Sequence, residues 1–187
     1  MWGINITIVT TIAIVALVLF IQVSRVKKGA AIFLILYVMS VLIITLFVRS
    51  FDVESKAHFN PIRKYVYIVQ SIENGINRAG ISGGWEALKD NEYKITEIIL
   101  NVLLFVPLGF LVPISSDFFR RAWKTVAIGF AFSFFIESMQ LVTHLGCFDV
   151  SDLIHNTMGA CIGYFIFYRW LKTDSRDVHL DITGGQI

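Results

Sequence analysis

Six polar residues interrupt otherwise apolar stretches in the second half of the chain. They are Asn101, Glu137, Gln140, Asp149, Asp152 and Asn156. Carboxylates accept hydrogen bonds from an amine, sugar or peptide group, and side-chain amides can orient the same partner. Carboxylates also serve in general acid–base chemistry, and they can hold a hard divalent cation through their oxygens. These residue types predict a functional polar site if the fold brings them together.

The spacing of these residues places several of them on the same face of a helix. One helical stripe, within roughly 60° at 100° per residue, holds Ser133, Glu137, Gln140 and His144. A second stripe, within roughly 80°, holds Asp149, Asp152, Asn156, Gly159 and Gly163. Glu97 and Asn101 lie one turn apart on a third apolar stretch. The elements that must position the site are therefore helices.

The composition indicates that these helices belong to an integral membrane protein. Of the 187 residues, 56% are hydrophobic and 16% are charged, and the mean hydropathy is +0.69. Soluble domains are about 45–50% apolar and about 25% charged, so a soluble enzyme, a disordered chain and a secreted disulfide framework are excluded. The net charge of +2 is too balanced for a nucleic-acid-binding protein. Cys147 and Cys161 are predicted to be free thiols, because 14 residues of helix separate them by roughly 20 Å.

Five stretches are long enough to cross a bilayer, which needs about 20 mostly apolar residues. They cover residues 3–23, 30–48, 95–114, 125–145 and 150–171. The first is interpreted as a retained helix rather than a signal peptide, because no basic residue precedes it. The expected fold is an all-α bundle of five transmembrane helices, with residues 1–172 as one transmembrane domain and residues 173–187 as a polar cytoplasmic tail.

The basic residues of the short loops predict the orientation of this bundle. Lys and Arg occur in the loops after the first and third spans and at the start of the tail, which are expected to be cytoplasmic. The connection Gly146–Asp149 has no Lys or Arg and is expected outside. The N-terminus then lies outside the plasma membrane and the C-terminus in the cytoplasm.

The long outer loop, residues 49–94, carries seven basic and six acidic residues, so its charge does not place it. The segment Asn60-Pro61-Ile62-Arg63 is expected to form a turn that opens a helix, because proline is tolerated in a first helical turn. Apolar residues follow at helical spacing at Tyr65, Ile68, Val69 and Ile72, which predicts a short amphipathic helix in the outer interface. The stretch from Asn74 to Gly84, rich in Gly and Asn, is expected to be a loop.

Depth in the membrane adds a separate argument for one site. At 1.5 Å per residue, Asn101, Glu137 and Asn156 lie roughly 9, 10 and 8 Å below the outer surface. The polar residues of three helices then share one layer in the outer leaflet. Gly159 and Gly163 form a small-xxx-small pair, whose expected role is close helix packing.

The order of these motifs resembles the VanZ-like family of bacterial membrane proteins over about residues 60–170. The resemblance is carried by Asn60-Pro61, the segment Asn101–Phe110 with Pro113, Glu137-x-x-Gln140 and Phe148-Asp149-x-x-Asp152-x-x-x-Asn156-x-x-Gly159-x-x-x-Gly163. Two departures stand out. Ser151 replaces an acid that many members carry, and no basic residue stands just before Phe148.

The resemblance implies a link to low-level resistance against teicoplanin-type lipoglycopeptides in Gram-positive bacteria. One hypothesis is that the outer-leaflet site binds a lipid-anchored ligand, either the lipoglycopeptide or a cell-wall precursor. The alternative is an intramembrane hydrolase or transferase acting on a lipid-linked envelope substrate. It would use His144 or His155 as acid or base, or a cation held by Glu137, Asp149 and Asp152. No obvious nucleophile supports this alternative, and a transporter is disfavoured because no inverted repeat is evident. The sequence leaves the ligand, any cofactor or metal, and the oligomeric state open.

Overall fold

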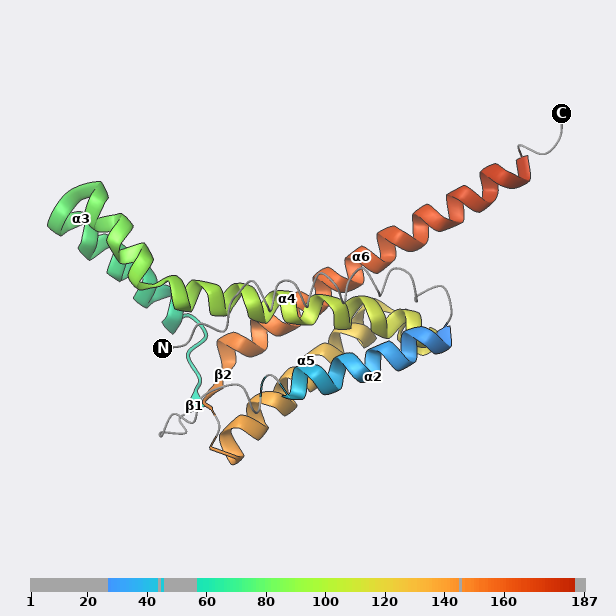
Figure 1. Ribbon diagram of the computed structural model, residues 1–187, viewed down its shortest axis with the longest axis horizontal. Helices are drawn as coiled ribbons and strands as arrows, with labels where there is room; N and C mark the ends of the chain where they lie inside the picture. The colour runs from blue at the N-terminus through green and yellow to red at the C-terminus, as the bar shows by residue number, and fades with distance from the viewer. Residues whose placement is uncertain (1–26, 44, 46–56, 145, 184–187) are drawn as a thin grey trace.

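The computed structural model of the chain describes residues 27–43, 45, 57–144 and 146–183. Within these residues the protein is all-helical apart from one pair of very short strands (Figure 1). The elements in chain order are α2 (Lys27–Ile43), β1 (Ala57–His58), α3 (Arg63–Asp90), α4 (Glu92–Ser115), the 3-10 turn η2 (Asp117–Phe119), α5 (Ala122–Val142), β2 (Phe148–Asp149) and α6 (Val150–Thr183). The helical fold class expected from the sequence is confirmed.

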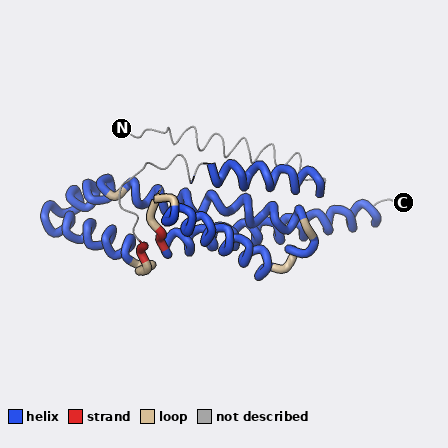
Figure 2. Tube along the Cα trace, turned by 90° about the horizontal axis from the view of Figure 1, so that it is seen from below, coloured by secondary structure: helices blue, strands red, loops and turns tan. Residues whose placement is uncertain are grey.

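Helix α4 is the centre of the bundle and packs against α2, α5 and α6 (Figures 1 and 2). Its buried residues belong to two adjoining hydrophobic clusters. The first contains Val41, Phe105, Leu108, Val112, Ile136 and Ala160. The second contains Ala30, Leu111, Ile114 and Phe167. Burial of these side chains fixes where α6 lies, and α6 carries Asp152 and Asn156 of the predicted site.

Small residues allow α4 and α6 to approach closely. Gly159 lies against the carbonyl oxygen of Val102, and Gly163 lies one turn further along against that of Val106. A Cβ atom at either glycine would overlap those backbone oxygens. Gly109 of α4 makes the reciprocal approach to Ala160. The glycine pair of the sequence therefore lies where the two backbones are nearest.

Within the described residues, two helices are long and apolar enough to cross a membrane, namely α4 and α5, which correspond to the third and fourth predicted spans. Of their most apolar windows 39% and 33% is buried inside the protein, so most residues of these windows are at least partly exposed. Helix α2 is apolar but shorter, and α6 contains the fifth span but begins with polar turns. The span at residues 3–23 lies outside the described residues. Crossing by five helices stays a prediction.

Helix α3 corrects the expectation of a loop from Asn74 to Gly84. The backbone is helical from Arg63 to Asp90 except at Ala79 and Gly80, and Gly80 has a φ of +63°. This break folds α3 back into a helical hairpin, whose two arms lie beyond the end of the bundle (Figures 1 and 2). Gly75 and Gly83 meet where the arms are closest, and a Cβ on either would overlap the backbone of the other. Glycine here serves close packing and one turn, not a flexible loop.

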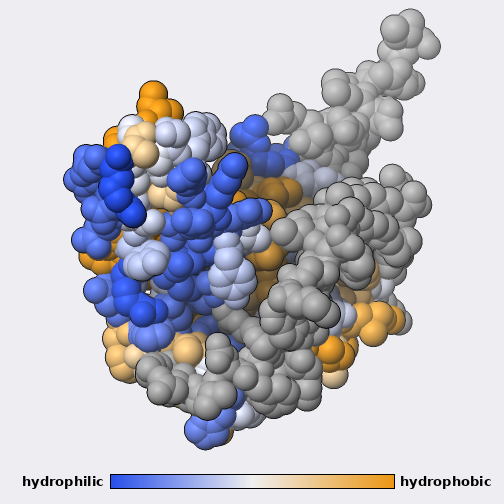
Figure 3. Space-filling view, turned by 60° about the vertical axis from the view of Figure 1, so that its left-hand side comes forward, coloured by the Kyte–Doolittle hydropathy of each residue, from blue (hydrophilic) through white to orange (hydrophobic). Residues whose placement is uncertain are grey.

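The strands attach the start of this hairpin to the connection between α5 and α6. They run parallel, with Ala57 opposite Phe148 and His58 opposite Asp149. The ring of Phe148 lies 6.2 Å from that of Phe59 and 5.9 Å from that of Phe134 on α5. This pairing brings the first turn of α3 next to the first turn of α6. Hydrophilic residues cover much of the face seen at this end of the molecule (Figure 3).

Candidate functional site

The ammonium group of Lys64 lies among three carboxylates at the junction of α3, α4 and α6. Its Nζ is 2.6 Å from Oδ1 of Asp152, 3.3 Å from Oδ2 of Asp149 and 3.3 Å from Oε2 of Glu97. The Lys64 side chain is 12% exposed, and those of Asp149 and Asp152 are 7% and 3% exposed. The arrangement is therefore a nearly buried charge cluster, called here the carboxylate cage.

The turn that precedes α3 positions Lys64 beside the three carboxylates. Oδ1 of Asn60 accepts a hydrogen bond from the backbone N–H of Ile62 at 3.1 Å, which closes a turn around Pro61. Helix α3 begins immediately afterwards, at Arg63. Lys64 consequently lies in the first helical turn, directly after the strand that pairs with Phe148 and Asp149.

The electrostatics of the cage keep Lys64 protonated. Burial by itself lowers the pKa of this lysine, because it disfavours the charged form. Attraction to Asp152 and the hydrogen bond with it outweigh burial, with smaller contributions from Glu97 and Asp149. The pKa of Lys64 consequently lies above its ordinary value.

Glu137 and Ser151 fix the position of Asp149. Oε2 of Glu137 accepts a hydrogen bond from the backbone N–H of Asp149 at 2.9 Å. Oδ1 of Asp149 in turn accepts from the backbone N–H and the hydroxyl of Ser151, at 2.8 and 2.7 Å. The Asp149 carboxylate therefore sits at the N-terminus of α6, where the helix dipole stabilises negative charge.

Buried His155 joins the cage to the hairpin. Its Nε2 is in hydrogen-bond contact with the hydroxyl of Tyr65, the residue after Lys64. Its Nδ1 is 3.8 Å from Oδ1 of Asp152 and has no hydrogen-bond partner among the described residues. His155 is 1% exposed, whereas His144 is exposed just beyond α5. Of the two histidines considered for acid–base chemistry, His155 is the one that the described residues place in contact with the site.

The three amide side chains of the predicted site, those of Asn101, Gln140 and Asn156, lie outside the carboxylate cage. Nδ2 of Asn156 donates to the hydroxyl of Ser133 on α5 at 2.9 Å. Nε2 of Gln140 donates to the carbonyl oxygen of Thr45 at 3.1 Å. Asn101 is half-buried on α4. Within the described part of the chain, Nδ2 of Asn101, Oε1 of Gln140 and Oδ1 of Asn156 are buried without a hydrogen-bond partner.

A comparison with protein-family models decides the family. The VanZ/LLP1 model matches residues 33–172, a range that includes the carboxylate cage and every predicted site residue. The chain belongs to the VanZ/LLP1 family. No curated protein and no solved structure matches the chain. Together with its apolar helices, this membership makes it a VanZ-like membrane protein.

The structure describes both positions at which the chain departs from the VanZ-like pattern. Ser151, in place of an acid, donates two hydrogen bonds to Asp149. No basic residue stands just before Phe148, and the ammonium that reaches Asp149 is that of Lys64 on α3. The site of this VanZ/LLP1 protein thus contains an ammonium group that arrives from another part of the chain.

Sequence reasoning missed Lys64, Tyr65 and the participation of Glu97. One signal pointed to a cation: buried carboxylates are costly unless they are paired. Nothing in the sequence says which of the seven basic residues of the outer loop supplies it. The divalent-cation arrangement of Glu137, Asp149 and Asp152 finds no support in the geometry. Across the described ranges, no group of three or more His, Cys, Asp or Glu side chains is arranged to hold a metal ion.

Proposed function

We propose that this VanZ/LLP1-family protein is a multi-pass protein of the bacterial plasma membrane that binds the headgroup of a lipid-anchored ligand at the outer face. The single observation that carries the proposal is the carboxylate cage around Lys64, at the end of the bundle that bears the α3 hairpin. Intramembrane ionisable groups that face a shared site mark function by default. In this topology the N-terminus is outside and the C-terminus is cytoplasmic.

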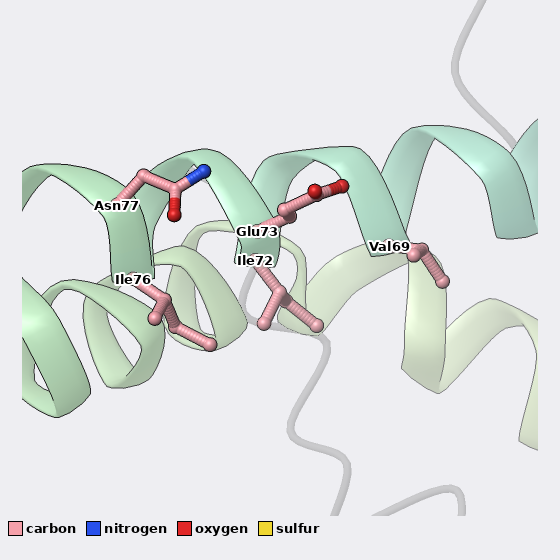
Figure 4. Close-up of a pocket in the computed structure, with 5 residues that line it drawn as sticks. All are labelled: Val69, Ile72, Glu73, Ile76 and Asn77. Atoms are coloured by element: carbon pink, nitrogen blue, oxygen red, sulfur yellow. The ribbon is translucent and has the colours of Figure 1, made fainter.

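The surface of the hairpin supports a position in the membrane interface. Exposed apolar and aromatic side chains on its two arms include Val66, Tyr67, Val69, Ile76, Ile81 and Trp85. Tyr and Trp are enriched at membrane–water interfaces. A shallow apolar pocket on the first arm is lined by Val69, Ile72 and Ile76, with Glu73 and Asn77 at its polar side (Figure 4). An interfacial hairpin places the cage beside lipid headgroups.

Envelope ligands with a lipid anchor reach this level of the outer leaflet. A lipoglycopeptide and a cell-wall precursor both present a polar group just above their anchors. Capture of either by the cage reduces the encounter between drug and target. This links the site to the teicoplanin resistance that the family resemblance implies, and more broadly to cell-envelope homeostasis.

Teicoplanin susceptibility of a sensitive Gram-positive host tests the proposal. The host expresses wild type, Glu137→Gln, Asp149→Asn or Asp152→Asn at matched membrane levels. We expect wild type to raise the inhibitory concentration and each of these variants to lose the effect. Glu86→Gln and Asp90→Asn make the same chemical changes at exposed positions and are expected to keep it. If all three site variants retain resistance, these carboxylates serve helix packing and not ligand binding.

The orientation has its own test. In a chain with both native cysteines replaced by alanine, a new cysteine is placed at Thr143 or at Ala122, exposed positions at opposite ends of α5. A membrane-impermeant maleimide added to intact cells is expected to label Thr143→Cys and to spare Ala122→Cys. The reverse labelling pattern would place the cage on the cytoplasmic side and would contradict a site in the outer leaflet.

A further inference from the structure

The carboxylate cage has the geometry that a primary ammonium group requires. A –NH3⁺ group has three N–H donors and no acceptor. Glu97, Asp149 and Asp152 present one carboxylate each to Lys64 Nζ, from α4, β2 and α6. Three donors therefore face three acceptors. A quaternary ammonium has no N–H to offer such a site, and a guanidinium is planar.

The cage is built by the bundle and not by the element that fills it. Asp149 is held by Glu137 and Ser151, which do not belong to the hairpin. Asp152 lies in the first turn of α6, whose packing against α4 is fixed at Gly159. Lys64 instead reaches in from α3 on a flexible four-carbon stem. The three carboxylates thus keep their places when the lysine leaves.

A second observation points to a ligand. His155 is 1% exposed, and its Nδ1 lies 3.8 Å from Oδ1 of Asp152 with no hydrogen-bond partner among the described residues. Leaving a buried ring nitrogen unpaired is costly. The methylene stem of Lys64 offers this nitrogen no partner, whereas a small ligand whose ammonium occupies the cage can carry an oxygen close to its nitrogen that accepts from an Nδ1–H.

We propose that the cage binds the primary ammonium of an ethanolamine-type phospholipid, which exchanges with Lys64. This inference rests on the headgroup site proposed above and names its ligand class. The incoming ammonium takes over the three carboxylates, so their charge stays compensated. The released Lys64, next to exposed Arg63, then faces the phosphate of the same headgroup. The exchange conserves the ion pairs and moves only the lysine side chain.

Lipid retention by the full-length protein tests the exchange. The protein is placed in nanodiscs of equal parts phosphatidylethanolamine and phosphatidylcholine, and native mass spectrometry measures which lipid stays bound. We expect wild type to retain phosphatidylethanolamine preferentially, and Lys64→Met to increase that preference several-fold because the internal competitor is gone. Asp152→Asn is expected to lose the preference, and Glu86→Gln to keep it. Equal retention of the two lipids by both wild type and Lys64→Met overturns the proposal.

Soluble amines separate the chemistry of the cage from the bilayer. In Lys64→Met, ethylammonium chloride is expected to raise the thermal unfolding temperature more than tetramethylammonium chloride at the same ionic strength. Wild type is expected to show a smaller difference between the two salts. If the amine stabilises Lys64→Met while wild type retains no phosphatidylethanolamine, Lys64 never yields its place and the exchange is wrong. None of these outcomes depends on teicoplanin. A negative result in the susceptibility test is therefore distinguishable from a negative result in the lipid-binding tests.

Discussion

Lys64 donates a 2.6 Å hydrogen bond to Asp152 across a separation of 88 residues in the chain. The bond joins the first turn of α3 to the first turn of α6. It is strengthened by the charge on both partners and by the low exposure of both side chains. This ion pair is therefore one of the contacts that hold the hairpin over the end of the bundle, beside the β1–β2 pairing and the contact of Tyr65 with His155.

Replacing Lys64 with methionine is expected to destabilise the protein. The change keeps the length and apolar packing of the side chain but removes the ammonium that pairs with Glu97, Asp149 and Asp152. Removing one partner of a buried ion pair costs about 3–5 kcal/mol, and partial exposure of Lys64 places this case at about 3 kcal/mol. The free energy of unfolding in detergent, followed by circular dichroism against denaturant, measures it.

Two variants control this measurement. Lys89→Met makes the same change at an exposed position of α3 and is expected to leave stability within about 0.5 kcal/mol of wild type. Lys64→Arg keeps the charge but replaces a compact ammonium by a planar fork, and is expected to recover only part of the loss. Equal stability of Lys64→Met and wild type would show that the cage contributes nothing to folding.

The raised pKa of Lys64 predicts how this stability depends on pH. A lysine whose pKa is higher in the folded state binds its proton more tightly there, so its contribution is complete below the unfolded pKa of about 10.4. The contribution is lost as the pH rises from that value through the folded pKa. The difference in unfolding temperature between wild type and Lys64→Met is expected to be constant from about pH 7 to 10 and to shrink above that range. A difference that shrinks already near neutrality would contradict the assignment.

Parts of the fold and of the site could be predicted because local patterns determine them. Long, mostly apolar runs place α4 and α5 within three residues of their observed bounds at each end. Glu137 meets the backbone of Asp149 because consecutive antiparallel helices with a short connection bring these ends together. The three-residue spacing of Asp149 and Asp152 places one just before α6 and the other in its first turn.

Lys64 could not be placed in the same way. Its position depends on the pairing of β1 with β2, which involves only two residues on each side. So short a strand leaves no alternating pattern in the sequence. The hairpin was missed for a related reason, because Gly75 and Gly83 read as loop residues until their partners across the fold are known.

Enlarging Gly159 is expected to separate α4 from α6. In Gly159→Leu the new side chain meets the backbone of Val102, which cannot move without shifting the helix. Overpacking of this kind costs about 1–3 kcal/mol. The unfolding temperature is expected to fall, and Cys161→Leu, at an exposed position of the same helix, is expected to leave it unchanged. An unfolding temperature in Gly159→Leu equal to that of the control would show that the contact tolerates a larger separation.

Tyr65 and His155 give the last prediction. In Tyr65→Phe the hydroxyl that contacts Nε2 of His155 is removed while the ring stays, so a buried imidazole loses its hydrogen-bond partner. An unsatisfied buried polar group costs about 1–3 kcal/mol. Because Tyr65 lies in the first turn of α3, the loss is expected to be local, and faster amide exchange near residues 63–67 measures it. Tyr67→Phe removes a more exposed hydroxyl from the same turn and is expected to leave the exchange unchanged. If both variants behave alike, the contact of Tyr65 with His155 does not stabilise the first turn of the hairpin, and its docking rests on Lys64 and the β1–β2 pairing.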